Sequence, residues 1–222
     1  MDETTVLSYP RRWRDAVIDW ALHFKEWWGW ARRVLKRFPA WITPNGVTVA
    51  RMALVVPILW LIAADRFDGA FVLAVVSFVG DFVDGALAHV RGQFTELGKV
   101  LDPLADKVVN YAVLGFLLPK LPAVFTLPVV ACAGIGLALT GWRLHKMVTH
   151  RLRGEPMPAS PANGPGKVKA VSEMVGISAL LFGLAFERRA IPGGAFFVWF
   201  GGALLALSIP FAVWSLRLQR RA

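Results

Sequence analysis

Residues 80–107 of this chain have the sequence GDFVDGALAHVRGQFTELGKVLDPLADK, and this stretch decides how the flanking segments must fold. Asp81 and Asp84 are three positions apart, whereas Asp102 and Asp106 are four positions apart. Both spacings place the two side chains on one face of a helix. The connection between the two pairs is short, so the helices are expected to be antiparallel neighbours. The sequence therefore predicts that four carboxylates converge on one point.

The segments around this stretch are long and apolar. Of the 222 residues, 56% are hydrophobic, and the mean hydropathy is +0.51. A run of about 20 apolar residues suffices to cross the hydrocarbon core of a bilayer. We therefore expect an all-α fold, a bundle of six transmembrane helices at approximately residues 47–64, 69–90, 99–118, 123–147, 168–186 and 194–216.

The first 42 residues have a different pattern. Apolar residues recur at three- and four-residue steps between Arg11 and Phe38, with Arg and Lys at many other positions, and six of the ten tryptophans occur by Trp41. Such a helix typically lies in the membrane interface. We expect residues 1–42 to form a cytoplasmic tail and this amphipathic helix; a soluble helix packed on the rest of the protein is the alternative.

The formal net charge of +10 indicates orientation rather than nucleic-acid binding, because the basic residues flank the apolar spans. One end of the bundle collects the basic N-terminal helix and Arg91, Lys99, Arg143, Lys146, Arg151, Arg153, Lys167, Lys169, Arg217, Arg220 and Arg221. The other end has only Arg66, Lys120, Arg188 and Arg189. We therefore expect a bacterial inner-membrane protein that contacts anionic lipids, with both termini and the aspartates on the cytoplasmic side.

Four neighbouring carboxylates in a membrane need compensating positive charge, since one charge near the bilayer centre costs about 2.5–3.5 kcal/mol. Oxygen ligands without His or Cys suit Mg²⁺ or Mn²⁺, which often complete their shells with substrate phosphates. Salt bridges to Arg91, Lys99 and Lys107 are the alternative. Small residues beside the aspartates would leave room for a ligand: Gly85, Ala88 and Gly98.

The run Asp81-x2-Asp84-Gly85-x2-Ala88-x9-Gly98-x3-Asp102-x3-Asp106 resembles the signature of the CDP-alcohol phosphatidyltransferases. The resemblance extends to Thr43-Pro44-Asn45 with Thr48 and Arg51, and to Gly166-Lys167-Val168-Lys169. It departs at one position, because the family normally has Arg directly after the motif alanine and this chain has His89. Arg91 is the candidate to replace that arginine.

The resemblance implies that residues 43–222 form the membrane domain of such an enzyme, often a homodimer, with an active site open to the cytoplasm. It implies that Asp81, Asp84 and Asp102 bind two divalent ions, and that Asp106 is the general base and also contacts a metal. The donor, CDP-diacylglycerol, would be bound at six further positions: Asn45, Thr48, Arg51, Gly85, Ala88 and Gly98.

Arg143, Lys167 and Lys169 form a second basic cluster that suits a phosphate-bearing acceptor, although positive-inside topology alone also explains it. The context looks most like phosphatidylglycerophosphate synthases, whose acceptor is sn-glycerol 3-phosphate. Cardiolipin synthases and inositol-phosphate-accepting relatives share the core motif. Two hypotheses from other classes are a cation transporter that uses the aspartates as an ion site and a non-catalytic membrane scaffold.

Overall fold

A computed structural model describes residues 33, 35, 37–39, 42–92, 96–153 and 164–221. Within these ranges, the description leaves out some side chains, including those of residues 96–104 and of Arg143. The amphipathic helix predicted within residues 1–42 lies almost entirely outside the described part of the chain, so it stays a prediction.

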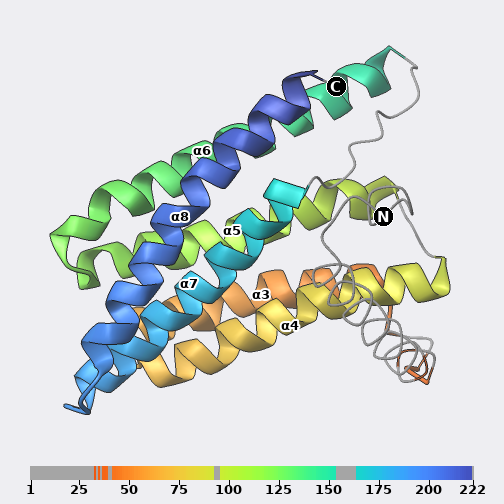
Figure 1. Ribbon diagram of the computed structural model, residues 1–222. Helices are drawn as coiled ribbons and strands as arrows, with labels where there is room; N and C mark the ends of the chain where they lie inside the picture. Colours follow the sequence, from red (N-terminus) through yellow and green to blue (C-terminus); the bar gives the residue numbers. More distant parts are fainter. Residues whose placement is uncertain are drawn as a thin grey trace, which may run out of the picture.

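The described chain is helical and contains no strand. Six long helices follow one another: α3 (Pro44–Ala63), α4 (Phe67–Arg91), α5 (Glu96–Leu117), α6 (Thr126–Leu152), α7 (Gly164–Arg188) and α8 (Gly194–Arg221). Two short 3₁₀ turns, η1 (Leu118–Lys120) and η2 (Ala123–Phe125), connect α5 to α6. Figure 1 shows these helices running back and forth as a bundle, which confirms the predicted all-α fold class.

Five segments of the described chain are long and apolar enough to cross a membrane: Pro44–Ala63, Phe67–Arg91, Ala123–His150, Gly166–Arg188 and Gly194–Ser215. The helix α5 has a comparable length but is interrupted by charged residues such as Asp106 and Lys107. The protein is therefore an integral membrane protein with an all-helical fold.

Two ion pairs gather the short turns at one end of the bundle. Lys120 at the end of η1 binds Asp65 in the turn between α3 and α4. Arg189, directly after α7, donates to Asp68 at the start of α4 over 2.9 Å. The prediction that the turns near Arg66, Lys120 and Arg189 share one end is thus confirmed.

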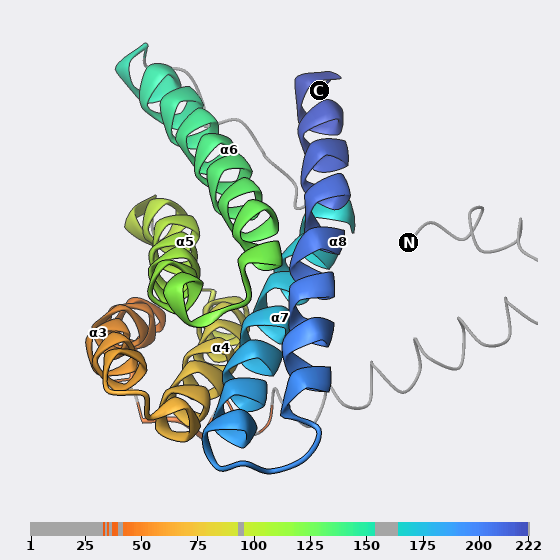
Figure 2. The ribbon, with the colours of Figure 1, turned by 90° about the vertical axis from the view of Figure 1, so that its left-hand side faces the viewer.

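The helices α7 and α8 pack closely along their lengths because glycines face each other (Figure 2). A Cβ atom on Gly201 would lie 2.7 Å from the carbonyl oxygen of Gly176, and one on Gly183 would lie 2.8 Å from that of Gly194. Small residues are the usual means by which membrane helices approach each other. In Figure 2, α7 lies between α8 and the group of α3, α4 and α5.

The interior divides into an apolar and a polar half. Side chains near the three short turns form an apolar core, with Ile58, Ile62, Leu117 and Leu181 fully buried. Towards the opposite end, beside a smaller apolar cluster at Ala86 and Leu87, many buried side chains are polar or charged: Thr48, Arg51, Ser77, Asp84, Asn110, Lys169, Ser172 and Glu173. Buried charges persist in a protein only where other groups pair with them. The polar half is therefore where a functional site is to be sought.

Candidate active site

Asp81 and Asp84 of α4 face the same arginine on α3. The Nη1 atom of Arg51 lies 2.7 Å from Oδ1 of Asp81 and 3.0 Å from Oδ2 of Asp84. The hydroxyl of Thr48, one turn before Arg51, donates to the same Oδ2 of Asp84 over 3.0 Å. The predicted pairing of the two aspartates on one helix face is confirmed, and one positive nitrogen lies between them.

Close packing between α3 and α4 fixes the position of Arg51, which is only 3% exposed. Its Nε donates to the backbone carbonyl of Ser77 over 2.8 Å. A Cβ on Gly80 would lie 2.8 Å from Cδ of Arg51, so the arginine lies flat against α4 only because residue 80 has no side chain. The guanidinium is therefore held by the backbone carbonyl of Ser77 and by the carboxylates of Asp81 and Asp84.

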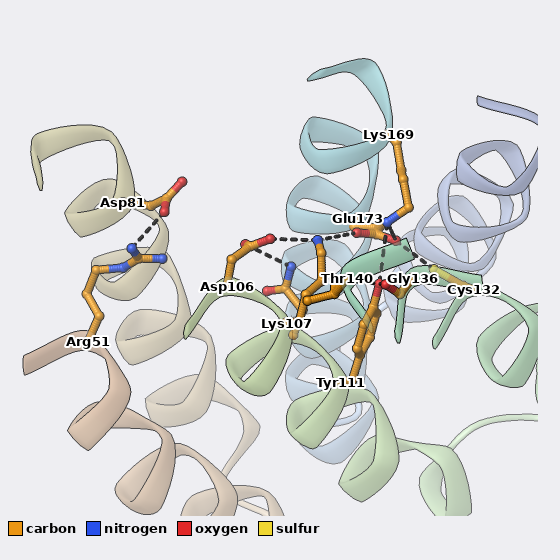
Figure 3. A network of polar contacts seen from close by, with 11 residues as sticks. Arg51, Asp81, Asp106, Lys107, Tyr111, Cys132, Gly136, Thr140, Lys169 and Glu173 are labelled. Carbon is orange, nitrogen blue, oxygen red and sulfur yellow. Dashed lines mark hydrogen bonds and ion pairs between the residues drawn. The ribbon is translucent and has the colours of Figure 1, made fainter. Parts of the chain in front are cut away.

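Asp106 approaches from α5. Its Oδ2 lies 2.6 Å from Nζ of Lys107, and its Oδ1 accepts a hydrogen bond of 3.3 Å from Nδ2 of Asn110. In Figure 3, Asp106 is drawn between the Arg51–Asp81 pair and Lys107. The side chain of Asp102, the fourth predicted carboxylate, lies outside the described residues.

The donor set fits a hard divalent cation, because Asp81, Asp84 and Asp106 offer carboxylate oxygens from two neighbouring segments of the chain. Among the described side chains, no three His, Cys, Asp or Glu residues form a group that could hold a metal as they stand. Instead, each described aspartate binds a cationic side chain, Arg51 or Lys107. The salt-bridge alternative is thus realised in part, with Arg51 as a partner that the sequence did not suggest for that role.

The small residues predicted to make room for a donor differ in their surroundings. A Cβ on Gly85 would meet no atom within 4 Å, and Gly85 is exposed beside Asp84. Ala88 and Asn45 are half-buried, and the side-chain position of Gly98 is outside the description. Thr48 and Arg51, also predicted to bind the donor, contact the aspartates directly.

Arg91, the candidate to replace the family arginine, contacts the backbone near the start of the membrane domain. Its guanidinium donates to the backbone carbonyls of Phe38, Pro39 and Ile42 over 2.7–3.2 Å. It thereby ties the end of α4 to the segment that precedes α3. His89, which stands where the family normally has arginine, has an exposed side chain.

The residues predicted to bind the acceptor phosphate differ in their exposure to solvent. Lys167 is exposed at the start of α7, whereas Lys169 is only 5% exposed and points into the bundle. The Nζ of Lys169 binds Oε1 of Glu173 over 2.5 Å and lies 3.4 Å from the hydroxyl of Tyr111. The third predicted residue, Arg143, has a side chain outside the described set.

Comparison with known proteins identifies the family. Residues 41–214, most of the chain, match the family model described as CDP-alcohol phosphatidyltransferase. The chain belongs to the CDP-alcohol phosphatidyltransferase family. The resemblance inferred from the aspartate motif is thereby confirmed, and the protein is an enzyme of this family.

Curated relatives of this transferase have two kinds of name. A CDP-diacylglycerol–glycerol-3-phosphate 3-phosphatidyltransferase of Bacillus subtilis is 31% identical over 173 residues, which cover 70% of this chain and 85% of the relative. A CMP-forming cardiolipin synthase of Streptomyces coelicolor is 31% identical over 168 residues, covering 70% of this chain and 74% of the relative. A CMP-forming cardiolipin synthase of rice is 29% identical over 196 residues, covering 80% and 56%.

The transferase has polar residues in its interior that the sequence reasoning did not single out. Glu173 has no exposed surface, and Asn110, which contacts Asp106, is 1% exposed. A signal was present for both. Glu173 is an acidic residue inside an apolar span. Because a charge is expensive to bury in a membrane, such a residue is a candidate for function. Asn110 follows Asp106 by four positions and so shares its helix face.

Proposed function

We propose that this transferase moves a phosphatidyl group from CDP-diacylglycerol to sn-glycerol 3-phosphate, with release of CMP and formation of phosphatidylglycerophosphate. The observation that carries the proposal is the family match over the part of the chain that bears Asp81, Asp84 and Asp106, on the consecutive helices α4 and α5. The match to the Bacillus subtilis relative covers most of that protein's length, and the name of that relative supports glycerol 3-phosphate as the acceptor.

The aspartates of α4 and α5 are proposed to hold two Mg²⁺ or Mn²⁺ ions through Asp81, Asp84, Asp102 and Asp106. Bound there, the ions would neutralise the charge on the pyrophosphate of the donor and on the departing CMP. Arg51 and Thr48 hold Asp81 and Asp84 in place, and the open space beside Gly85 would accommodate the donor. Ala88, Gly98 and Asn45 complete the proposed donor site.

Asp106 is proposed as the general base. The carboxylate would accept the proton of the acceptor hydroxyl as that oxygen forms a bond to the phosphorus bearing diacylglycerol. The bond between this phosphorus and the oxygen of CMP breaks, and CMP leaves with the electron pair. Asn110 orients Asp106 by its hydrogen bond to Oδ1, which leaves Oδ2 to exchange partners.

The acceptor phosphate is proposed to bind Arg143, Lys167 and Lys169, because charge-assisted bonds to phosphate are strong. The exposed position of Lys167 at the start of α7 is compatible with capture of a soluble acceptor. Lys169 lies deeper, between Glu173 and Tyr111, on the side of the bundle that holds Lys107.

The membrane placement is part of the proposal. We infer that α5 is a sixth span whose charged face is covered by its neighbours, and that residues 1–42 supply an interfacial helix. The excess of basic residues at the end opposite the short turns supports a cytoplasmic active site and cytoplasmic termini in a bacterial inner membrane. A homodimer is proposed from the resemblance alone.

An acceptor panel tests the proposal directly. The purified full chain is incubated with labelled CDP-diacylglycerol, Mg²⁺ and one of three acceptors: glycerol 3-phosphate, phosphatidylglycerol or an inositol phosphate. CMP release that depends on glycerol 3-phosphate is expected. Release only with phosphatidylglycerol would make the protein a cardiolipin synthase, the alternative that the Streptomyces coelicolor relative suggests.

A matched pair of variants separates the enzyme from a cation transporter or a scaffold. Asp106→Asn is expected to lower the rate of CMP release by about 10²–10⁴, the usual contribution of a general base. Asp68→Asn removes a carboxylate from the exposed pair with Arg189 at the other end and is expected to leave the rate unchanged. Equal activity of the two variants would remove Asp106 from the mechanism.

A further inference from the structure

Four charged side chains alternate in sign between α5 and α7. The Oδ2 of Asp106 lies 2.6 Å from Nζ of Lys107, which lies 3.6 Å from Oε2 of Glu173. The Oε1 of Glu173 in turn lies 2.5 Å from Nζ of Lys169. Figure 3 shows this series beginning at Asp106 and ending at Lys169. Two carboxylates and two ammonium groups balance each other without any external ion.

The two oxygens of Glu173 have different surroundings. Oε1 accepts from Lys169 and, over 2.9 Å, from the thiol of Cys132 on α6. Oε2 is buried and accepts no hydrogen bond from any described group. A buried acceptor without a donor costs free energy, and native structures rarely keep one without a reason. Oε2 is therefore an acceptor that a nearby donor can occupy.

Lys107 is the donor within reach of that oxygen. Its ammonium makes a short contact with Asp106 and a longer one with Glu173. It also lies 5.7 Å from the ring centre of Tyr111 on its own helix. A lysine carries a point charge on a flexible stem, so its ammonium can exchange one carboxylate for another with little change in the backbone. A displacement of about 1 Å towards Oε2 would complete a hydrogen bond there and free Asp106.

We propose that Lys107 is a positioning residue whose ammonium passes between Asp106 and Glu173. Without a divalent cation at the aspartates, Lys107 neutralises Asp106. When a cation binds, repulsion drives the ammonium to Oε2 of Glu173, and Asp106 becomes free to bind the cation and the acceptor hydroxyl. No covalent bond changes and no proton is transferred. The inference depends on the proposed cation site.

The chemistry of the network favours exchange over a static ion pair. In a static network, each charged atom would be expected to lie within hydrogen-bond distance of its partner. The contact between Lys107 and Oε2 of Glu173 is too long for a hydrogen bond. The carboxylate of Glu173 is fully buried, so its Oε2 is not hydrated by bulk solvent. The Lys107 ammonium thus contacts the carboxylate of Asp106, while Oε2 of Glu173 is an acceptor to which it could move.

A double-mutant cycle on Mn²⁺ binding tests the exchange without relying on turnover. Binding to the purified full chain in nanodiscs is measured by electron paramagnetic resonance for wild type, Lys107→Gln, Glu173→Gln and the double variant. Lys107→Gln is expected to bind Mn²⁺ about tenfold more tightly, because the competing cation is gone. Glu173→Gln is expected to bind about tenfold more weakly, because Lys107 stays on Asp106.

The double variant decides between exchange and simple charge effects. In the Lys107→Gln background, Glu173→Gln is expected to change Mn²⁺ affinity by less than about twofold. A static network predicts the same factor in both backgrounds, and that result would overturn the proposal. Wild type that binds no Mn²⁺ would overturn the cation site and the exchange together, whereas binding with additive effects would overturn only the exchange.

Two further measurements keep the test decisive if Glu173→Gln does not fold. Lys107→Gln alone must still bind Mn²⁺ more tightly than wild type; unchanged or weaker binding contradicts the exchange. Lys120→Gln removes a lysine that binds Asp65 at the opposite end and is expected to leave Mn²⁺ affinity unchanged. An equal increase in both lysine variants would mean that only the net charge of the protein acts.

Discussion

Arg51 on α3 donates from Nη1 to Oδ2 of Asp84 on α4 over 3.0 Å, across 33 positions of sequence. The same nitrogen contacts Asp81, so one buried guanidinium binds both motif aspartates of α4. Separation of α3 from α4 would leave two carboxylates without that partner. This contact therefore links the packing of α3 on α4 to the charges in the candidate active site.

Loss of the Arg51 charge should destabilise the protein and make it depend on metal. Removing one partner of a buried ion pair costs about 3–5 kcal/mol, because the remaining charge stays buried. Arg51→Gln should lower the thermal unfolding temperature. Added Mg²⁺ should then raise the unfolding temperature of this variant by more than it raises that of wild type. Arg189→Gln breaks an exposed pair and should cost less than about 1 kcal/mol. Equal Mg²⁺ responses in Arg51→Gln and wild type would argue against a cation between Asp81 and Asp84.

Gly85→Ala should impair the enzyme without impairing the fold. The added methyl group would contact nothing in the described protein, and alanine favours a helix by about 1 kcal/mol over glycine. We expect unchanged or higher unfolding temperature with a Michaelis constant for CDP-diacylglycerol raised about tenfold, a cost of about 1.4 kcal/mol. Gly80→Ala should instead lose stability, since its Cβ would lie 2.8 Å from Arg51 Cδ. Full activity of Gly85→Ala would remove residue 85 from the donor site.

Gly136→Ala should disturb Tyr111. A Cβ at residue 136 would lie 1.5 Å from the hydroxyl oxygen of Tyr111, so either the ring or α6 must move. Overpacking of this kind typically costs about 1–3 kcal/mol. On the same helix, Gly134→Ala meets no atom within 4 Å and should leave the unfolding temperature unchanged or slightly raised. If both variants unfold at the wild-type temperature, the contact between Tyr111 and α6 is looser than the structure shows.

The pair between Asp65 and Lys120 should produce an acid-dependent loss of stability. The hydrogen bond from Lys120 holds the pKa of Asp65 below its ordinary value of 3.8. A lowered pKa in the folded state means that the pair stabilises the fold above about pH 3.8 and stops doing so as the pH falls through the folded pKa. Asp65→Asn should therefore be less stable than wild type at pH 7, and the difference should vanish in strong acid.

Asparagine is the suitable replacement because residue 65 has a left-handed backbone with φ of 56°. Asn adopts this conformation readily, so Asp65→Asn changes the charge without straining the turn. The unfolding temperature of both proteins is measured from pH 7 to pH 3. A stability difference that stays constant over this range would show that the charge of Asp65 does not matter.

Much of the fold follows from local patterns. Apolar runs bounded by Pro, Gly and charged residues predict the long helices, because backbone groups in a bilayer must be paired within a segment. The α3 helix illustrates this, since Thr43 caps its first turn through Gly46 and Pro44 begins it. Whether α5 is a span is harder to predict, because its charges lower its hydropathy and pair with residues of other helices.

Local patterns in the chain suffice to predict the helices, the family and the spacing that brings Asp81 and Asp84 to one face, because these depend on periodicity and motifs within single segments. Which cation binds which carboxylate follows from the packing of the helices instead. Arg51 joins the aspartates of α4 from another helix, and Lys169 pairs with Glu173 inside the bundle. Such pairings depend on how helices rotate and pack against each other, because a charge buried by that packing must find its partner within a few ångströms.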